Sequence, residues 1–263
     1  MPQPIGQFPR SLLRHSRWTR VGDVPCVCIH PSIEGGAADS AWPASPAPTL
    51  LWLHGRTVNK ELDPGRYQRH LAAGIATIAI DLPGHGERAI DSMQGPGSLA
   101  DLIEQCLPEL DAVADWAEHA GLARPGAWAI GGMSAGGMVA ACRLCLPHRF
   151  GALVMESSTG DLLSLPGAAD RGGPRLAALN PIDRLDRWRS VPVLALHSEL
   201  DCVVPVGGVR RFVEALKRRA IDPSAITLHT WPSTGAPDEH AGFGRMAPEA
   251  KSMGTAFLQR VLV

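Results

Sequence analysis

Neither a long apolar run nor an excess of one charge is present in this sequence of 263 residues. The 25 Lys and Arg residues nearly balance the 26 Asp and Glu residues, which leaves a net charge of −1. A chain so balanced has no overall field that would hold nucleic acid or an anionic membrane surface, so neither is expected as a partner. No stretch approaches the roughly 18 uninterrupted apolar residues of a membrane-spanning helix, so no membrane span is expected.

Cysteines and N-terminal apolar residues are also scarce. Residues 1–20 contain four scattered arginines and no apolar core, so no secretory signal is expected. The chain has only six cysteines, which favours a reducing, cytoplasmic compartment. Cys142 and Cys145 have Cys-x-x-Cys spacing, but they fall within a predicted helix and no second pair lies nearby. We therefore expect buried small side chains there rather than a metal or redox centre.

The apolar fraction, 45%, is enough for a sizeable buried core, and it is distributed as short apolar runs that alternate with helical stretches. Runs that are apolar throughout are typical of strands covered on both faces, and their alternation with helices predicts a mostly parallel α/β sheet. The predicted strands are two short runs within 16–30, then 49–53, 75–80, 128–131, 152–156, 191–196 and 226–231. The predicted helices are 65–73, 98–119, 135–146, 207–219 and 248–262.

Three segments depart from this alternation. Residues 42–48 form a proline-rich connector with no strand or helix character. Pro108 interrupts the longest predicted helix, so a kink or a break near Leu107 is expected. Residues 157–189 are rich in loops with short apolar helical pieces, and we expect a small lid-like insertion over the sheet. Because that segment is too short to be a domain, the chain 1–263 is predicted to form a single domain.

A Gly-x-Ser-x-Gly motif at residues 132–136 stands between a predicted strand and a predicted helix. The motif alone is a weak signal, and an ordinary glycine-rich turn is the alternative. Its position, however, is where a nucleophile elbow must lie. Small residues around Ser134 suit the sharp turn and the close approach of strand and helix that such an elbow needs. Ser134 is therefore a candidate nucleophile.

A serine hydroxyl needs a base to take its proton and a carboxylate to orient that base. In an open α/β sheet these groups come from the C-terminal ends of the strands. Asp201 follows the run 191–196, and His240 follows the run 226–231, in the order Ser, Asp, His along the chain. Asp161, after an earlier run, is the alternative acid. The sequence thus predicts a serine, an acid and a base at three strand ends.

With these residues the chain resembles the α/β-hydrolase superfamily, and within it the small bacterial esterases of the dienelactone-hydrolase and prolyl-oligopeptidase-like branch. The resemblance covers nearly the whole chain from about Val24. It rests on five segments in the family's order: Leu53-His54-Gly55, Asp81-Leu82-Pro83-Gly84-His85-Gly86, Gly132 to Gly136, His197 to Pro205, and His240. The resemblance implies an α/β-hydrolase fold with helices on both faces of the sheet. It also implies Ser134 as nucleophile, Asp201 as acid and His240 as base.

The resemblance further implies an oxyanion hole made by two backbone N–H groups. One belongs to Ala135, and the other to Arg56, with Thr57 as the near alternative. The implied reaction is hydrolysis of carboxylic esters with small to medium acyl groups through an acyl-enzyme. A lactonase, thioesterase, dienelactone hydrolase, small peptidase or acyltransferase would use the same groups. No metal-ligand spacing and no nucleotide-binding glycine motif occurs, so no metal or cofactor is expected.

Some features differ from the family's pattern or lie outside it. Small esterases of this type often have an aromatic residue where Arg56 stands. Its side chain either reaches an acidic group of the substrate or remains solvated. The single tyrosine, Tyr67, falls in a predicted helix, so the tyrosine oxyanion donor of the prolyl-oligopeptidase peptidases is missing. Asp238 and Glu239, beside His240, are expected to be solvated. The apolar side chains of the insertion favour a modest pocket; they are Leu162, Leu163, Leu165, Leu176, Leu179 and Trp188.

Overall fold

A single sheet of eight strands organises the protein in its computed structural model, which describes residues 8–33 and 45–263. The order across the sheet is β1-β2-β4-β3-β5-β6-β7-β8. The strands are β1 (Ser16–Val21), β2 (Val24–Ile29), β3 (Ala47–Leu53), β4 (Ala76–Ile80), β5 (Ala123–Met133), β6 (Leu153–Glu156), β7 (Val193–Ser198) and β8 (Ile226–Trp231). β2 is antiparallel to both β1 and β4, and the other neighbours are parallel. The predicted mostly parallel α/β fold is confirmed.

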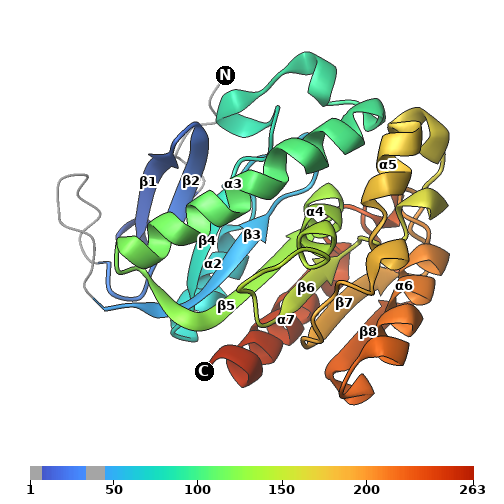
Figure 1. Cartoon of the computed structure of the whole chain (residues 1–263). Coiled ribbons are helices and arrows are strands. Elements are labelled where there is room, and N and C mark those ends of the chain that lie inside the picture. The colour runs from blue at the N-terminus through green and yellow to red at the C-terminus, as the bar shows by residue number, and fades with distance from the viewer. Residues whose placement is uncertain (1–7, 34–44) are drawn as a thin grey trace.

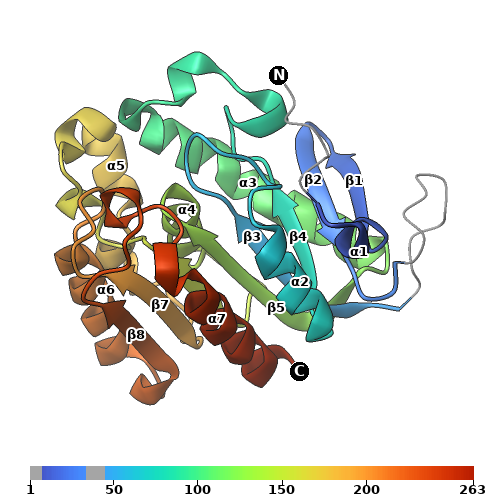
Figure 2. The same ribbon diagram turned by 180° about the vertical axis from the view of Figure 1, so that it is seen from behind.

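Helices cover both faces of the sheet (Figures 1 and 2). They are α1 (Arg10–Leu13), α2 (Pro64–Ala72), α3 (Leu99–His119), α4 (Ala135–Arg143), α5 (Gly173–Leu179), α6 (Val206–Arg219) and α7 (Ala247–Leu262). One apolar core joins the sheet to α3, α4, α5 and α6, and a second joins its other face to α1, α2 and α7. Within the described ranges the structure contains no helix whose length and apolar content would suffice for a membrane crossing.

Several predicted boundaries were wrong, most of all that of β5, which was predicted over 128–131 and spans Ala123–Met133. Two further predictions need correction. The proline-rich connector lies outside the described residues over 42–44, but its last two residues already belong to β3, where Ala47 pairs with Ala123. The break expected near Leu107 does not occur, because α3 is a continuous helix that contains Pro108. Cys106 and Leu110, on either side of the proline, are fully buried in the same core. Burial on both sides offsets the roughly 3 kcal/mol that an internal proline costs a helix.

The segment 157–189 forms short 3-10 turns and α5, and it packs beside α3 and α6 (Figure 1). Most of its apolar side chains point into the core on that face; Leu162, Leu165, Leu176 and Trp188 are buried there, and Leu179 is partly buried. Leu163 is exposed. These side chains hold the segment against the helices, so the segment is anchored rather than loose.

The start of α4 fits closely against the end of β3. A Cβ added at Gly136 would lie 2.3 Å from the carbonyl oxygen of Leu53 and 2.5 Å from that of His54. Such a contact needs a backbone shift, because both neighbours are main-chain atoms. The second glycine of the motif is thus required by packing between the helix and the strand.

Replacing Gly136 with Ala should lower the free energy of unfolding by about 1–3 kcal/mol, because the added methyl group overpacks this contact. Urea unfolding followed by circular dichroism measures the change. Gly207→Ala, in the first turn of α6, is the matched control, since its Cβ would meet only the end of the Arg211 side chain at 3.5 Å. Equal stability of the two variants would contradict the packing account.

Candidate active site

Ser134 lies in a strained turn between β5 and α4. Its φ of 51° and ψ of −121° form a backbone conformation that residues other than glycine seldom adopt. Two hydrogen bonds to the Ser134 backbone hold this turn: the Ser134 N–H donates to the carbonyl oxygen of Glu156 at 2.8 Å, and the Ser158 hydroxyl donates to the carbonyl oxygen of Ser134 at 2.8 Å. The turn therefore has the conformation that was predicted for a nucleophile elbow.

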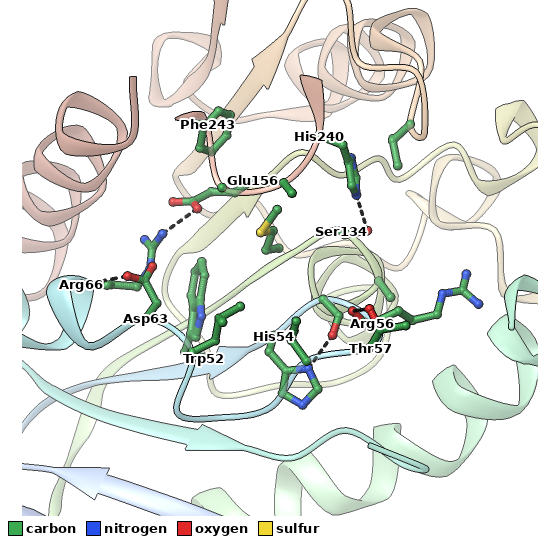
Figure 3. Close-up of a pocket in the computed structure, with 18 of the residues that line it drawn as sticks. Trp52, His54, Arg56, Thr57, Asp63, Arg66, Ser134, Glu156, His240 and Phe243 are labelled. Atoms are coloured by element: carbon green, nitrogen blue, oxygen red, sulfur yellow. Dashed lines mark hydrogen bonds and ion pairs between the residues drawn. The ribbon is translucent and has the colours of Figure 1, made fainter. Parts of the chain in front are cut away.

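The three residues predicted at strand ends meet in space, and Figure 3 shows two of them, Ser134 and His240, facing each other. His240 Nε2 is 2.9 Å from the Ser134 hydroxyl oxygen, and His240 Nδ1 is 2.8 Å from Asp201 Oδ2. With Nδ1–H donating to the carboxylate, Nε2 accepts the hydroxyl hydrogen. The arrangement gives the serine a base, and the base an orienting carboxylate.

The Asp201 side chain is fully buried and is fixed by its own loop. Its Oδ1 accepts hydrogen bonds from the backbone N–H groups of Val203 and Val204, at 2.9 and 2.7 Å. Its second oxygen, Oδ2, faces His240. The alternative acid, Asp161, is elsewhere: it pairs with Arg211 of α6 at 2.8 Å.

Glu239, expected to be solvated, instead holds the loop that carries His240. Its carboxylate accepts five hydrogen bonds: one each from the hydroxyls of Ser198, Ser233 and Thr234, and one each from the backbone N–H groups of Thr234 and Gly235. The Ser198 hydroxyl, followed by the other donors, holds the pKa of Glu239 well below its usual range. Because Ser198 ends β7, these bonds tie the loop of His240 to the sheet.

The loop after β3 lies on the other side of Ser134. A Cβ added at Gly55 would be 3.5 Å from the Ser134 Cβ, so this loop runs directly beside the serine. Buried His54 holds it: Nε2 accepts the N–H of Leu82 at 3.0 Å, and Nδ1 faces the Gly55 carbonyl oxygen at 2.5 Å. Burial lowers the pKa of His54 to about 4, so its ring is neutral at pH 7.

A cavity of about 560 Å³ opens beside Ser134, within the size range of small-molecule sites. Arg56, Thr57, Ala135 and Arg171 line it near the serine. Among the described residues, Arg171 is the one residue of the segment 157–189 in this lining. The guanidinium of Arg56 donates to the Gly95 carbonyl oxygen, and burial followed by the charge of Arg171 lowers the pKa of Arg56 to about 10.

Sequence reasoning missed a group of charged residues in the same cavity. Arg66 of α2 and Glu156 of β6 form a buried ion pair, Nη2 to Oε2 at 2.6 Å, and both line the cavity. A signal for Glu156 was available, since it is a carboxylate at the C-terminal end of an apolar, buried strand. Arg66 had no comparable signal, because a cation on an amphipathic helix is usually solvated.

Comparison with known proteins assigns the family. The alpha/beta hydrolase family model matches residues 27–241. The chain belongs to this family. No match to its sequence was found among the curated proteins compared.

Several solved structures share the hydrolase fold. TT1662 from Thermus thermophilus is 25% identical with a TM-score of 0.70, and the match covers 94% of this chain and 98% of that one. Esterase 2 of Thermogutta terrifontis, solved phosphoramylated by tabun, is 18% identical with a TM-score of 0.68. The match covers 95% of this chain and 96% of the esterase. A puromycin-hydrolyzing peptidase from Mycobacterium tuberculosis is 20% identical with a TM-score of 0.72, covering 97% of this chain. This hydrolase spans only 40% of that peptidase's length.

The stability of the hydrolase should fall with acidity between about pH 6.5 and 4. The unfolded chain binds a proton on His54 near pH 6.5, whereas the folded chain binds it only near 4, so the unfolded state gains protons first. Over the whole window His54 contributes a loss of about 3 kcal/mol in the free energy of unfolding. Urea unfolding at several pH values checks this. His54→Gln should lose stability less steeply than the wild type, and His119→Gln, an exposed control, should keep the wild-type slope. Equal slopes for all three proteins would contradict the assignment.

Replacing Glu239 with Gln should slow the reaction of Ser134 with a fluorophosphonate by about tenfold, because the loop loses charge-assisted hydrogen bonds and His240 moves from its position beside the serine. Stopped-flow labelling measures the rate constant. Glu214→Gln, on the exposed face of α6, is the control and should react like the wild type. A wild-type rate constant in Glu239→Gln would exclude a positioning role for Glu239. So would a wild-type rate constant in a second variant, Glu239→Ala, which lacks the carboxylate altogether.

Proposed function

We propose that this protein is a serine hydrolase that cleaves carboxylic esters with small to medium acyl groups. The observation that carries the proposal is the chain of hydrogen bonds from Asp201 through His240 to Ser134, at the wall of a ligand-sized cavity. A structural role alone gives no reason to join three strand ends in this way. The family assignment and the full-length likeness to an esterase support the same conclusion.

In the proposed reaction, the Ser134 oxygen attacks the ester carbonyl carbon while its proton passes to His240 Nε2. The tetrahedral intermediate collapses, and the bond to the alcohol oxygen breaks as His240 returns the proton to the leaving alcohol. Water then attacks the acyl-enzyme with the same proton transfers and releases the acid. Asp201 keeps the imidazole in the required tautomer and stabilises its charged form. No cofactor takes part in this scheme.

The oxyanion hole in this proposal consists of the backbone N–H groups of Ala135 and Arg56, with Thr57 as the near alternative. Ala135 begins α4, so its N–H is one of the groups left unpaired at a helix N-terminus. The loop of Arg56 runs beside Ser134 and is fixed by His54. Each such donor is worth roughly 3–4 kcal/mol in the transition state.

We propose esters rather than peptides as the substrate class on one observation. The esterase matches this chain over nearly the full length of both, whereas this chain spans two-fifths of the peptidase. Hydrolysis of lactones or thioesters, and acyl transfer to an alcohol, would use the same catalytic groups. Turnover of a panel of these substrates, with and without an added acceptor alcohol, ranks these activities. We also infer a reducing, cytoplasmic location, with which the six free cysteines agree.

Replacing Ser134 with Ala should reduce turnover of p-nitrophenyl butyrate to near background, a loss of at least about 10³-fold, because the nucleophile is gone. The thermal unfolding midpoint should stay close to that of the wild type. Ser252→Ala, at an exposed position on α7, serves as control and should retain full turnover. Labelling with a fluorophosphonate should add one adduct, at Ser134. Wild-type turnover in Ser134→Ala would end the proposal.

A further inference from the structure

The cavity beside Ser134 has a second, charged end that the proposed reaction does not use. Figure 3 shows Arg66, Asp63 and Glu156 on one side of the close-up, with Arg56 on the other. Arg66 and Glu156 are 3% and 1% exposed. This end is formed by the start of α2, the end of β6 and a lysine of α7, so three separate elements bring it together.

Glu156 has one carboxylate oxygen in use and one free. Oε2 pairs with Arg66, but Oε1 is buried and has no hydrogen-bond partner among the residues that the structure describes. Buried carboxylate oxygens in proteins are normally paired, and an exception points to a missing water or ligand. Glu156 lines the cavity, so the cavity is the side from which we expect a ligand group to approach Oε1.

The charges around Glu156 cancel, which limits the kind of group that fits. Arg66 Nε is 3.0 Å from Asp63 Oδ2, and Lys251 Nζ is 2.7 Å from Asp63 Oδ1. Two cations thus face two anions. A neutral hydrogen-bond donor keeps this balance in a site shielded from water, whereas an ammonium group would leave one uncompensated charge.

Apolar side chains lie beside the charged ones in the walls of the cavity. The Arg66 guanidinium lies 4.0 Å from the centre of the Trp52 ring, and Phe243 and Met133 also line the cavity. Such walls suit an aromatic or aliphatic body, and one hydroxyl at its tip would reach the free oxygen. The combination of apolar walls with a single free acceptor is typical of a specificity pocket.

We propose that this end of the cavity is a subsite for an apolar group of the ester that carries a hydroxyl, and that Glu156 Oε1 accepts the hydrogen bond from that hydroxyl. The proposal rests on the proposed function in that the bound group is part of the ester substrate. Arg66 acts as a positioning residue, because it pairs with Oε2 and leaves Oε1 as the oxygen without a partner. A subsite built to bind a hydroxyl discriminates strongly against an analogue that lacks it.

Matched ester pairs test the subsite from both sides of the scissile bond. One pair consists of the methyl esters of para-hydroxyphenylpropanoic acid and phenylpropanoic acid. The other consists of para-hydroxyphenylethyl acetate and phenylethyl acetate. In the wild type, kcat/KM should favour the hydroxyl-bearing member of at least one pair by about tenfold or more. Each comparison is made within one enzyme, so a loss common to both substrates cancels.

Glu156→Gln tests the acceptor while retaining an oxygen for Arg66. Its amide presents N–H where Oε1 was, so the preference for the hydroxyl should fall below about threefold. Glu118→Gln is the matched control: like Glu156, Glu118 pairs with an arginine, but it lies on the remote helix α3 and accepts from Trp128 there. It should keep the wild-type preference.

A binding measurement separates failure of the subsite from failure of the catalytic proposal. Calorimetry on Ser134→Ala compares para-hydroxyphenylbutanone with phenylbutanone, two ketones that cannot be hydrolysed. A tenfold lower Kd for the hydroxyl compound, without turnover of any ester by the wild type, would reject the catalytic proposal and uphold the subsite. Equal kcat/KM within both ester pairs, together with equal Kd values, would overturn the subsite. A wild-type preference that persists in Glu156→Gln would overturn the role of Glu156.

Discussion

The imidazole of His240 is the group on which the rest of the site depends. It must lie within hydrogen-bond distance of Ser134 on one side and Asp201 on the other, and it does so at 2.9 and 2.8 Å. The contact with Ser134 joins segments 106 residues apart in sequence, and the contact with Asp201 joins segments 39 residues apart. A loop without further contacts would not hold the imidazole at these distances. The loop of His240 is therefore tied to the edge of the sheet. The five hydrogen bonds to Glu239 fix the loop itself.

The parallel sheet explains why the candidate residues could be recognised without coordinates. Parallel strands place their C-terminal ends on one edge, so a serine, an acid and a base that follow three such strands must approach one another. The apolar runs were long enough to identify those strands. The strained conformation of Ser134 was also predictable, because glycines and alanines surround it. Each of these inferences depends on local sequence combined with one rule of topology.

Other features depend on contacts between distant residues, which no local pattern contains. Pro108 was expected to kink or break its helix. The helix does not break, and burial on both sides of the proline offsets its local cost. Glu239 was expected to be solvated, as charged side chains usually are. The structure instead joins it to Ser198, 41 residues away, as well as to donors of its own loop. The pair of Arg66 and Glu156 is the extreme case: each residue alone resembles an ordinary charged side chain, and only the tertiary fold brings the two together.

The electrostatic character of the cavity changes from one end to the other. Around Glu156 two cations and two anions compensate each other, and burial is tolerated because each charge has a partner. Around Arg56 and Arg171, no carboxylate lies within ion-pair distance among residues 8–33 and 45–263, and burial, together with the neighbouring cation, lowers the pKa of Arg56. In Figure 3, Ser134 lies between Arg56 and the Arg66–Glu156 pair. In the proposed reaction, the uncompensated positive charge near Arg56 favours the negative charge that develops on the carbonyl oxygen, and the proposed subsite at the compensated end adds hydrogen bonding without adding net charge.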